Sequence, residues 1–219
     1  MGKLLTAEDV RALPPGSVLE LDQHTRITPL GLDEARARSV RVRRPGEPPA
    51  GAAALERLHQ EINRSGPIAL GSDHAGFALK SELKAALTQA GHKVVDLGVF
   101  SPAPADYPDL AARVARLVAR GECPRGVLVD GAGVGSAIAA NKIAGARAAF
   151  CPDLATARNA REHNGANILC LGAKPLTLHS ALPIVATFLE AQLTEERHLL
   201  RVAKILALEG RAEFAELKP

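Results

Sequence analysis

The stretch from Val127 to Lys142, VLVDGAGVGSAIAANK, constrains the fold more than any other part of the chain. An apolar run ends in an acid, Asp130. A glycine-rich turn containing Gly131, Gly133 and Gly135 then leads into an alanine-rich helical run. This order predicts a buried parallel strand, followed by a turn whose backbone N–H groups can face an anion at a helix N-terminus. Because open α/β sheets bind ligands at the carboxyl ends of their strands, Asp130 is expected at a ligand site.

The same alternation of strand and helix extends over residues 66–193. Five strand-like runs (67–72, 92–97, 125–130, 146–151 and 166–171) are separated by helical runs that begin near Gly76, Tyr107, Val134, Asp153 and Thr177. This pattern predicts an α/β fold, a doubly wound Rossmann-like sheet of five parallel strands with helices on both faces. Residues 194–219 add a charged helix and tail without a following strand, and this helix could pack across to a neighbouring subunit.

The N-terminal part of the chain differs from this alternation. Residues 1–45 predict a small α+β appendage, with Thr28 and Pro29 at a helix start and a short strand at 39–42. Residues 46–65 begin as a linker rich in proline and glycine and continue as a short amphipathic helix at 53–63. This helix could dock on a partner or on its own domain, and the second reading is favoured.

Composition excludes several classes of function. Aromatic residues make up 3% of the chain, tryptophan is absent and the net charge is +3, so we expect no nucleic-acid partner. The three cysteines form no CxxC pattern, and no His/Asp/Glu cluster has the spacing of metal ligands, so neither a disulfide framework nor a metal site is expected. With no signal-like or membrane-length apolar run, we expect a cytoplasmic protein without a membrane partner.

Three further motifs carry polar groups suited to chemistry. Asp73 and His74 follow the first strand of the α/β pattern, at the same sheet edge as Asp130, where they could transfer protons or hold a sugar phosphate. His163 and Asn164 end a helix, and Arg197 and Arg201 are four residues apart on one helical face, a spacing that suits a phosphate clamp. Taken singly, Asp73 and His74 are as typical of a helix cap with an incidental histidine. His163 alone is more typical of a helix cap, and the arginine pair alone is more typical of surface charge.

Taken together, the motifs resemble those of the ribose-5-phosphate isomerase B and galactose-6-phosphate isomerase family. The resemblance spans about residues 67–202 and rests on IALGSDHAGFALK, DLG, DYPDLA, the glycine loop with IAANK, AREHNGANILCLGA and ERHLLRV. It implies a homodimer, sometimes paired into a tetramer, with active sites shared between subunits. It also implies interconversion of an aldose and a ketose phosphate, first of all ribose 5-phosphate and ribulose 5-phosphate, through an enediolate without metal or cofactor.

The resemblance also implies a role for each candidate residue. His163 would open the sugar ring, Asn164 would support the open chain, and Asp73 and Tyr107 would hold ring or hydroxyl oxygens. Backbone N–H groups of the glycine loop would stabilise the oxyanion, and side chains on both chains would bind the phosphate. The loop set is Gly131, Ala132, Gly133, Gly135 and Ser136, and the phosphate set is His74, Arg197 and Arg201, with the arginines, His163 and Asn164 donated by the partner chain.

The chain departs from the family at the position of the catalytic base. Commoner members carry a cysteine base followed by Gly-Thr-Gly, where this chain has Asp130 followed by Gly-Ala-Gly. Another branch uses a glutamate at the position of Ser136. We hypothesise that Asp130 replaces the missing base, which would require burial to raise its pKa from about 3.9. The other reading is that Asp130 accepts a hydrogen bond from a sugar hydroxyl.

The altered loop leaves alternatives for the whole protein. One is a weak or silent homologue that binds sugar phosphates, and another is an isomerase of a hexose 6-phosphate. A dinucleotide enzyme is disfavoured, because GAGVGS lacks the G-x-G-x-x-G spacing and follows the third strand. The segment VLELDQHTRITPLGLDEARARSVRV weakly resembles N-terminal segments of enzymes of bacterial microcompartments, which would imply packaging with shell or cargo proteins.

Overall fold

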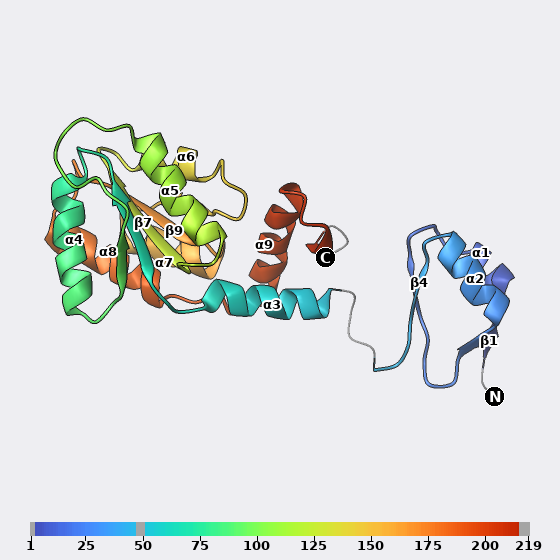
Figure 1. Cartoon of the computed structure of the whole chain (residues 1–219). Helices are drawn as coiled ribbons and strands as arrows, with labels where there is room; N and C mark the ends of the chain where they lie inside the picture. Colours follow the sequence, from blue (N-terminus) through green and yellow to red (C-terminus); the bar gives the residue numbers. More distant parts are fainter. Residues whose placement is uncertain (1–2, 47–50, 215–219) are drawn as a thin grey trace. The chain divides into compact units, whose positions relative to one another are not determined.

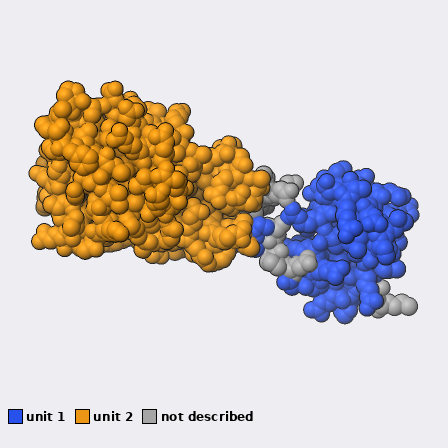
Figure 2. Space-filling view, viewed as in Figure 1, with its two compact units in different colours: residues 1–52 blue, residues 53–219 orange. Residues whose placement is uncertain are grey.

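The computed structural model describes residues 3–46 and 51–214. Its contacts divide the chain into two compact units, residues 1–52 and residues 53–219 (Figure 2). The predicted appendage falls within the first unit. The second unit contains the predicted α/β domain and also most of helix α3 (Ala52–Asn63) and the C-terminal helix α9 (Glu196–Leu208). Residues 47–50 of the predicted linker and residues 215–219 of the predicted tail lie outside the described part of the chain.

The first unit is a small α+β structure. Strands β1 and β3 pair in parallel, as do β2 and β4. Val10, Ala35 and Val40 form a small core in this unit. The predicted helix start is confirmed, because Thr28 Oγ1 accepts a hydrogen bond from Gly31 N at 3.1 Å. Its elements are β1 (Leu4–Leu5), α1 (Ala7–Arg11), β2 (Val18–Glu20), β3 (Arg26–Ile27), α2 (Pro29–Ala37) and β4 (Arg41–Arg43).

The second unit contains the predicted sheet. All five strands are parallel and lie in the order β6-β5-β7-β9-β8, so the predicted α/β class is confirmed (Figure 1). Its strands are β5 (Ile68–Ser72), β6 (Val94–Asp96), β7 (Arg125–Asp130), β8 (Ala148–Phe150) and β9 (Ile168–Gly172). The helices between and after them are α4 (Phe77–Gln89), α5 (Tyr107–Ala119), α6 (Val134–Ala140), α7 (Leu154–Glu162) and α8 (Leu178–Glu190), and the short 3-10 helix η1 (Ala212–Phe214) follows α9.

Helices cover both faces of this sheet, which explains why its strands are nearly continuous apolar runs. Successive side chains of a strand point to opposite faces. On β7, Val127 and Val129 therefore join the core under α4, α7 and α8, and Leu128 joins the core under α5 and α6. Figure 1 shows these helices around the sheet. The chain order of the strands reverses between β5 and β7, and the carboxyl ends of these two neighbours form the topological switch point.

A third core lies between α3 and α9. Leu58 and Ile62 of α3 pack with Leu199, Val202 and Leu206 of α9. The amphipathic helix after the linker therefore packs on its own domain, and the apolar face of α9 is covered within the chain. Among the described residues, no helix combines the length and apolarity that crossing a membrane requires.

Candidate active site

The polar residues predicted at the ends of the first and third sheet strands lie at the switch point. Asp130 is the last residue of β7, and Asp73 directly follows its neighbour β5. The N–H of Asp73 donates to the carbonyl oxygen of Val129 at 3.2 Å, which joins the two strand ends. Both carboxylates are buried, at 4% exposure for Asp130 and 7% for Asp73. The sheet topology thus brings together two acids that are 57 positions apart in the sequence.

The glycine loop wraps around the Asp130 carboxylate. Its Oδ1 accepts hydrogen bonds from the backbone N–H groups of Ala132, at 2.8 Å, and Gly133, and its Oδ2 accepts one from Ser136 N at 2.8 Å. Gly133 has a φ of 83°, a left-handed conformation that glycine adopts without steric cost. The anion that the loop holds in this structure is therefore the chain's own carboxylate.

This geometry corrects two sequence-based expectations. Burial acts to raise the pKa of Asp130, but the hydrogen bonds from Ser136, Gly133 and Ala132 act in the opposite direction, and the pKa lies below its ordinary value. The requirement that burial raise this pKa is therefore not met. In addition, the amides of these residues donate to Asp130, and a substrate oxyanion could use them only by displacing the carboxylate.

The remaining predicted residues of this sheet edge lie in the segments that follow β5 and begin α5. Asp73 Oδ1 accepts from Gly76 N at 2.9 Å, which closes the turn after β5. The exposed His74 accepts from Ala105 N through Nδ1 at 3.2 Å. Tyr107 begins α5, is 41% exposed, and lies so close to Gly135 that a Cβ there would be 2.7 Å from Cε2 of its ring. The lack of a side chain at Gly135 thus gives Tyr107 its place beside the loop.

Lys174 is a residue of this edge that sequence reasoning missed. It follows β9, and its backbone N–H donates to the carbonyl oxygen of Gly131 at 3.2 Å. Its Cε lies 3.5 Å from the position that a Cβ would take on Gly131. The signal was available, because LGAK places a lysine just after the strand that neighbours β7. The exposed side chain adds a positive charge beside the glycine loop.

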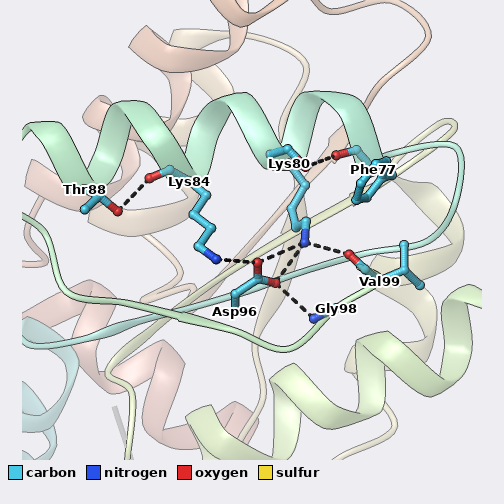
Figure 3. A network of polar contacts seen from close by, with 8 residues as sticks. Phe77, Lys80, Lys84, Thr88, Asp96, Gly98 and Val99 are labelled. Atoms are coloured by element: carbon cyan, nitrogen blue, oxygen red, sulfur yellow. Dashed lines mark hydrogen bonds and ion pairs between the residues drawn. The ribbon is translucent and has the colours of Figure 1, made fainter. Parts of the chain in front are cut away.

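A buried ion pair supports the loop between β6 and α5 that leads to Tyr107 (Figure 3). Lys80 Nζ, on α4, donates to both carboxylate oxygens of Asp96, at 2.9 and 3.1 Å, and to the carbonyl oxygen of Val99 at 2.7 Å. Asp96 also accepts from Gly98 N and from Lys84 at 3.0 Å each. The Lys80 side chain is 2% exposed and that of Lys84 is 47% exposed. The two lysines therefore bind one carboxylate in different surroundings.

This difference predicts different costs for the two lysines. Lys80→Met should lower the free energy of unfolding by about 3–5 kcal/mol, because it removes one partner of a buried ion pair. The matched control Lys84→Met, at the exposed end, should cost about 0–1 kcal/mol. Urea unfolding followed by circular dichroism measures both values, and equal values for the two variants would contradict the assignment.

The pH dependence of stability provides a second test of the same site. Burial acts to raise the pKa of Asp96, but the hydrogen bonds from Lys80, Gly98 and Lys84 prevail and lower it below 3.8. A lowered folded pKa stabilises the native state above the unfolded pKa, and this stabilisation is lost as the pH falls through the folded value. The stability difference between the wild type and Asp96→Asn should therefore shrink below about pH 4.

A second group of predicted residues lies at the opposite edge of the sheet, where the strands begin. His163 ends α7 just before β9 begins, and its Nδ1 lies 2.8 Å from Asn159 Nδ2. Its ring stacks on that of His198 of α9, with centroids 4.2 Å apart. Arg201 Nη1 lies 3.4 Å from His198 Nδ1. Helix α9 thus joins His163 to one of the predicted phosphate ligands within one chain.

His198 is the second residue that sequence reasoning missed. It lies in the ERHLLR motif that also holds the two arginines, and the structure buries it to 4% exposure. Burial, and then the neighbouring His163 and arginines, lower the pKa of His198 below its ordinary value. Asn164 and Arg197 are exposed beside this pair. This edge therefore presents imidazole, amide and guanidinium groups and no acid of the switch-point set.

The two groups cannot meet within one copy of the chain. All five strands run in parallel, so Asp130 at the end of β7 and His163 before the start of β9 lie at opposite edges. A strand of five to six residues is about 17–20 Å long, farther than a pentose phosphate extends. The structure thus brings together Asp73, His74, Tyr107 and Asp130 at one edge, and His163, Asn164, Arg197 and Arg201 at the other.

The described residues offer neither a cluster of metal ligands nor a reactive thiol. Within residues 3–46 and 51–214, no cluster of His, Cys, Asp or Glu has an arrangement that could hold a metal ion. Cys123, Cys151 and Cys170 are buried and free. Burial raises the pKa of each thiol, to about 12 for Cys151, so none is poised as a thiolate.

Comparison with known proteins identifies the family of the domain that carries both groups of candidate residues. Residues 68–205 match the family described as ribose/galactose isomerase. Ribose-5-phosphate isomerase B of Escherichia coli (strain K12) is 45% identical over 144 residues, which are 66% of this chain and 97% of that protein. The chain belongs to the ribose/galactose isomerase family. The family resemblance predicted from the motifs is therefore confirmed.

Solved structures of the family show the same fold. A structure of Clostridium thermocellum ribose-5-phosphate isomerase B is 46% identical, covers 66% of this chain and 98% of that one, and has a TM-score of 0.65. The enzyme from Mycoplasma genitalium, solved with bound ribulose-5-phosphate, is 39% identical over 68% of this chain and 99% of that one, with a TM-score of 0.64. The first unit and α3 lie outside the residues matched to the ribose/galactose isomerase family.

Proposed function

We propose that the chain is an aldose–ketose isomerase of a phosphorylated sugar, with ribose 5-phosphate and ribulose 5-phosphate as its substrate pair. The observation that carries this proposal is a buried carboxylate at the switch point of a ribose/galactose isomerase domain. The relatives at 45% and 46% identity are named for ribose 5-phosphate, which favours the pentose over a hexose 6-phosphate.

The chemistry needs one group that moves a proton between adjacent carbons. In the open-chain aldose, a base removes the proton from C2 and the electrons move to the C1 carbonyl oxygen. A proton then passes from O2 to O1 in the enediolate, and C1 takes back the proton that the base removed as the C2 carbonyl forms. We assign this proton transfer to Asp130, because its lowered pKa keeps the carboxylate ionised, and so able to accept a proton, at neutral pH. A carboxylate has about four acceptor positions, and the backbone amides of Ala132, Gly133 and Ser136 occupy three of them.

Positive charge near the reacting oxygens must then come from side chains. Lys174 beside Gly131 is suited to this role, and Lys174 or the exposed His74 could hold the phosphate. Asp73 and Tyr107 would hold hydroxyl oxygens of the sugar. Since a lowered basicity weakens proton abstraction, we expect a slower enzyme than one with a base whose pKa lies near neutrality.

The site would be completed by a second copy of the chain. Asp130 and His163 lie at opposite edges of the sheet, so we infer a homodimer in which the partner supplies His163, Asn164, Arg197 and Arg201 to this chain's switch point. In that arrangement His163 would open the ring, and the two arginines would bind the phosphate. Packaging of the protein through its N-terminal segment stays a prediction.

A silent sugar-phosphate binder is the second candidate, favoured by the amides that Asp130 occupies. Incubation with ribose 5-phosphate in D2O separates the two. An isomerase forms ribulose 5-phosphate and incorporates deuterium at the exchanging carbon, which NMR detects. Binding of the sugar phosphate without product or deuterium would favour the silent homologue.

The phosphate role of α9 leads to a separate prediction. Arg201→Ala should raise KM for ribose 5-phosphate about 10- to 100-fold with a smaller effect on kcat, because a charge-assisted bond to a non-reacting phosphate contributes to binding. Lys204→Ala, an exposed position of the same helix, is the control. Steady-state kinetics measure both, and an unchanged KM in Arg201→Ala would remove Arg201 from the phosphate site.

A further inference from the structure

Helix α3 precedes the residues that match the family, yet nearly all of it belongs to the second compact unit, residues 53–219. Its buried face, Ala54, Leu58 and Ile62, packs on α9, the helix that carries His198 and Arg201. Gly165, two residues after His163, lies at the same junction, where a Cβ would be 3.2 Å from Ile62 Cδ1 and 3.3 Å from Val202 Cγ2. The end of α7, α3 and α9 therefore meet at one point.

Polar contacts hold the end of α3 to the segment that leads into α9. Asn63 Nδ2 donates to the carbonyl oxygen of Leu193 at 2.8 Å, and Leu193 N donates to Asn63 Oδ1 at 3.0 Å. His59 Nε2 lies 2.9 Å from the same carbonyl oxygen. Leu193 is completely buried and precedes α9 by three residues. The side chain of Asn63 thus satisfies both backbone groups of Leu193 and sets the path of the chain into α9.

Two buried arginines hold the carboxyl end of α3 to the sheet domain. Ile62 O accepts from Arg125 Nη2 at 2.8 Å and from Arg161 Nη2 at 3.0 Å. Burial lowers the pKa of Arg125 to about 10 and that of Arg161 to about 9, so both remain cationic at neutral pH. Two cations at a helix C-terminus complement the partial negative charge of its carbonyls. Arg161 lies two residues before His163, so this contact links α3 to the position of that imidazole.

We infer that α3 is a brace that positions α9 and the end of α7, and that Asn63 is a positioning residue for Arg201, His198 and His163. This inference rests on the proposed isomerase function for its kinetic consequence. The structural coupling itself does not depend on that function. The brace is an addition to the matched family domain, because it comes from residues before position 68.

The full-length variant Asn63→Ala tests the brace. We expect the KM for ribose 5-phosphate and the Ki of inorganic phosphate as a competitive inhibitor to rise together, by about 5- to 10-fold, with kcat within about twofold of wild type. Backbone amides of α9 should exchange with solvent deuterium at least about tenfold faster. Gln60→Ala, on the exposed face of α3, is the matched control and should change neither readout.

A merely structural role would lower the fraction of folded enzyme, and would reduce kcat while KM and Ki stayed constant. That result, or unchanged exchange of α9 in folded Asn63→Ala, would overturn the inference. If Asn63→Ala does not fold, His59→Leu, which loses one contact to Leu193, gives the same comparison in milder form. If the wild type shows no isomerase activity, faster exchange of α9 together with weaker binding of inorganic phosphate would still support the brace while the proposed function fails.

Discussion

Asp130→Asn should lower kcat for ribose 5-phosphate isomerisation by about a hundred- to ten-thousandfold, with little change in KM. The substitution keeps the size of the side chain but removes the group that accepts the proton. An amide can still accept from Ala132 and Gly133 through its oxygen, while its NH2 faces the N–H of Ser136. Steady-state kinetics with a coupled assay measure the loss, and the thermal unfolding midpoint reports the effect on the loop.

Asp130→Cys is the informative companion, because the commoner family members have a cysteine base there. We expect it to recover part of the activity lost in Asp130→Asn, and the added Ala132→Thr to increase the recovery. In the wild type, the pKa of Asp130 is lowered, so Asp130 becomes protonated, and activity is lost, only below about pH 4. A thiol, with an ordinary pKa of about 8.5, should move the acid limb of kcat/KM to higher pH.

A result within a few fold of wild type for Asp130→Asn would assign the base to another group. Asp130 would then act as the anion that shapes the glycine loop. In that case the substitution should still destabilise the protein, since a buried N–H of the loop loses its acceptor, at a cost of about 1–3 kcal/mol. Destabilisation is expected in either case, so it is the kinetic measurement that separates a proton carrier from a structural acid.

Mixing two inactive variants should restore activity if the site is shared. Asp130→Asn damages the switch point and His163→Ala damages the opposite edge, so each pure dimer has two defective sites. In a hybrid, one site carries both lesions and the other carries none. Statistical mixing makes half of the dimers hybrid, so co-expression should give about a quarter of wild-type activity, against a few per cent or less for each parent.

Differently tagged copies allow the hybrid to be purified and its composition checked by mass spectrometry. A hybrid with no more activity than its parents would contradict a site completed by the partner chain. Two variants from the same edge, Asp130→Asn and Asp73→Asn, are the control pair, since their hybrid leaves a lesion in both sites. That pair should not complement.

Much of the fold could be predicted because its signals are local. The apolar run ending at Asp130, the glycine turn after it and the cap at Thr28 each depend on residues within one turn or strand. The placement of Asp73 beside Asp130 also followed, since carboxyl ends of parallel strands meet at one edge. The family motifs added expected roles for residues such as His163, which no local pattern distinguishes from a helix cap.

The interactions that determine the chemistry of the site were harder to predict from the sequence. Sequence reasoning treated the loop amides as donors to a substrate, while the structure directs three of them to Asp130 and so lowers its pKa. Lys174 and His198 were missed because each becomes part of a candidate site through contact with a distant segment, Gly131 for one and His163 for the other.

The sequence by itself determined the parallel α/β architecture, the sheet edge at which Asp73 and Asp130 lie, and the family. Periodicity and strand-end residues encode these properties locally. Only the tertiary structure decided which group the loop amides bind, which ring stacks on His163 and that α3 closes over α9. The physical reason is that a hydrogen bond or a ring contact depends on tenths of an ångström, set by the packing of segments as far apart as Asn63 and Leu193.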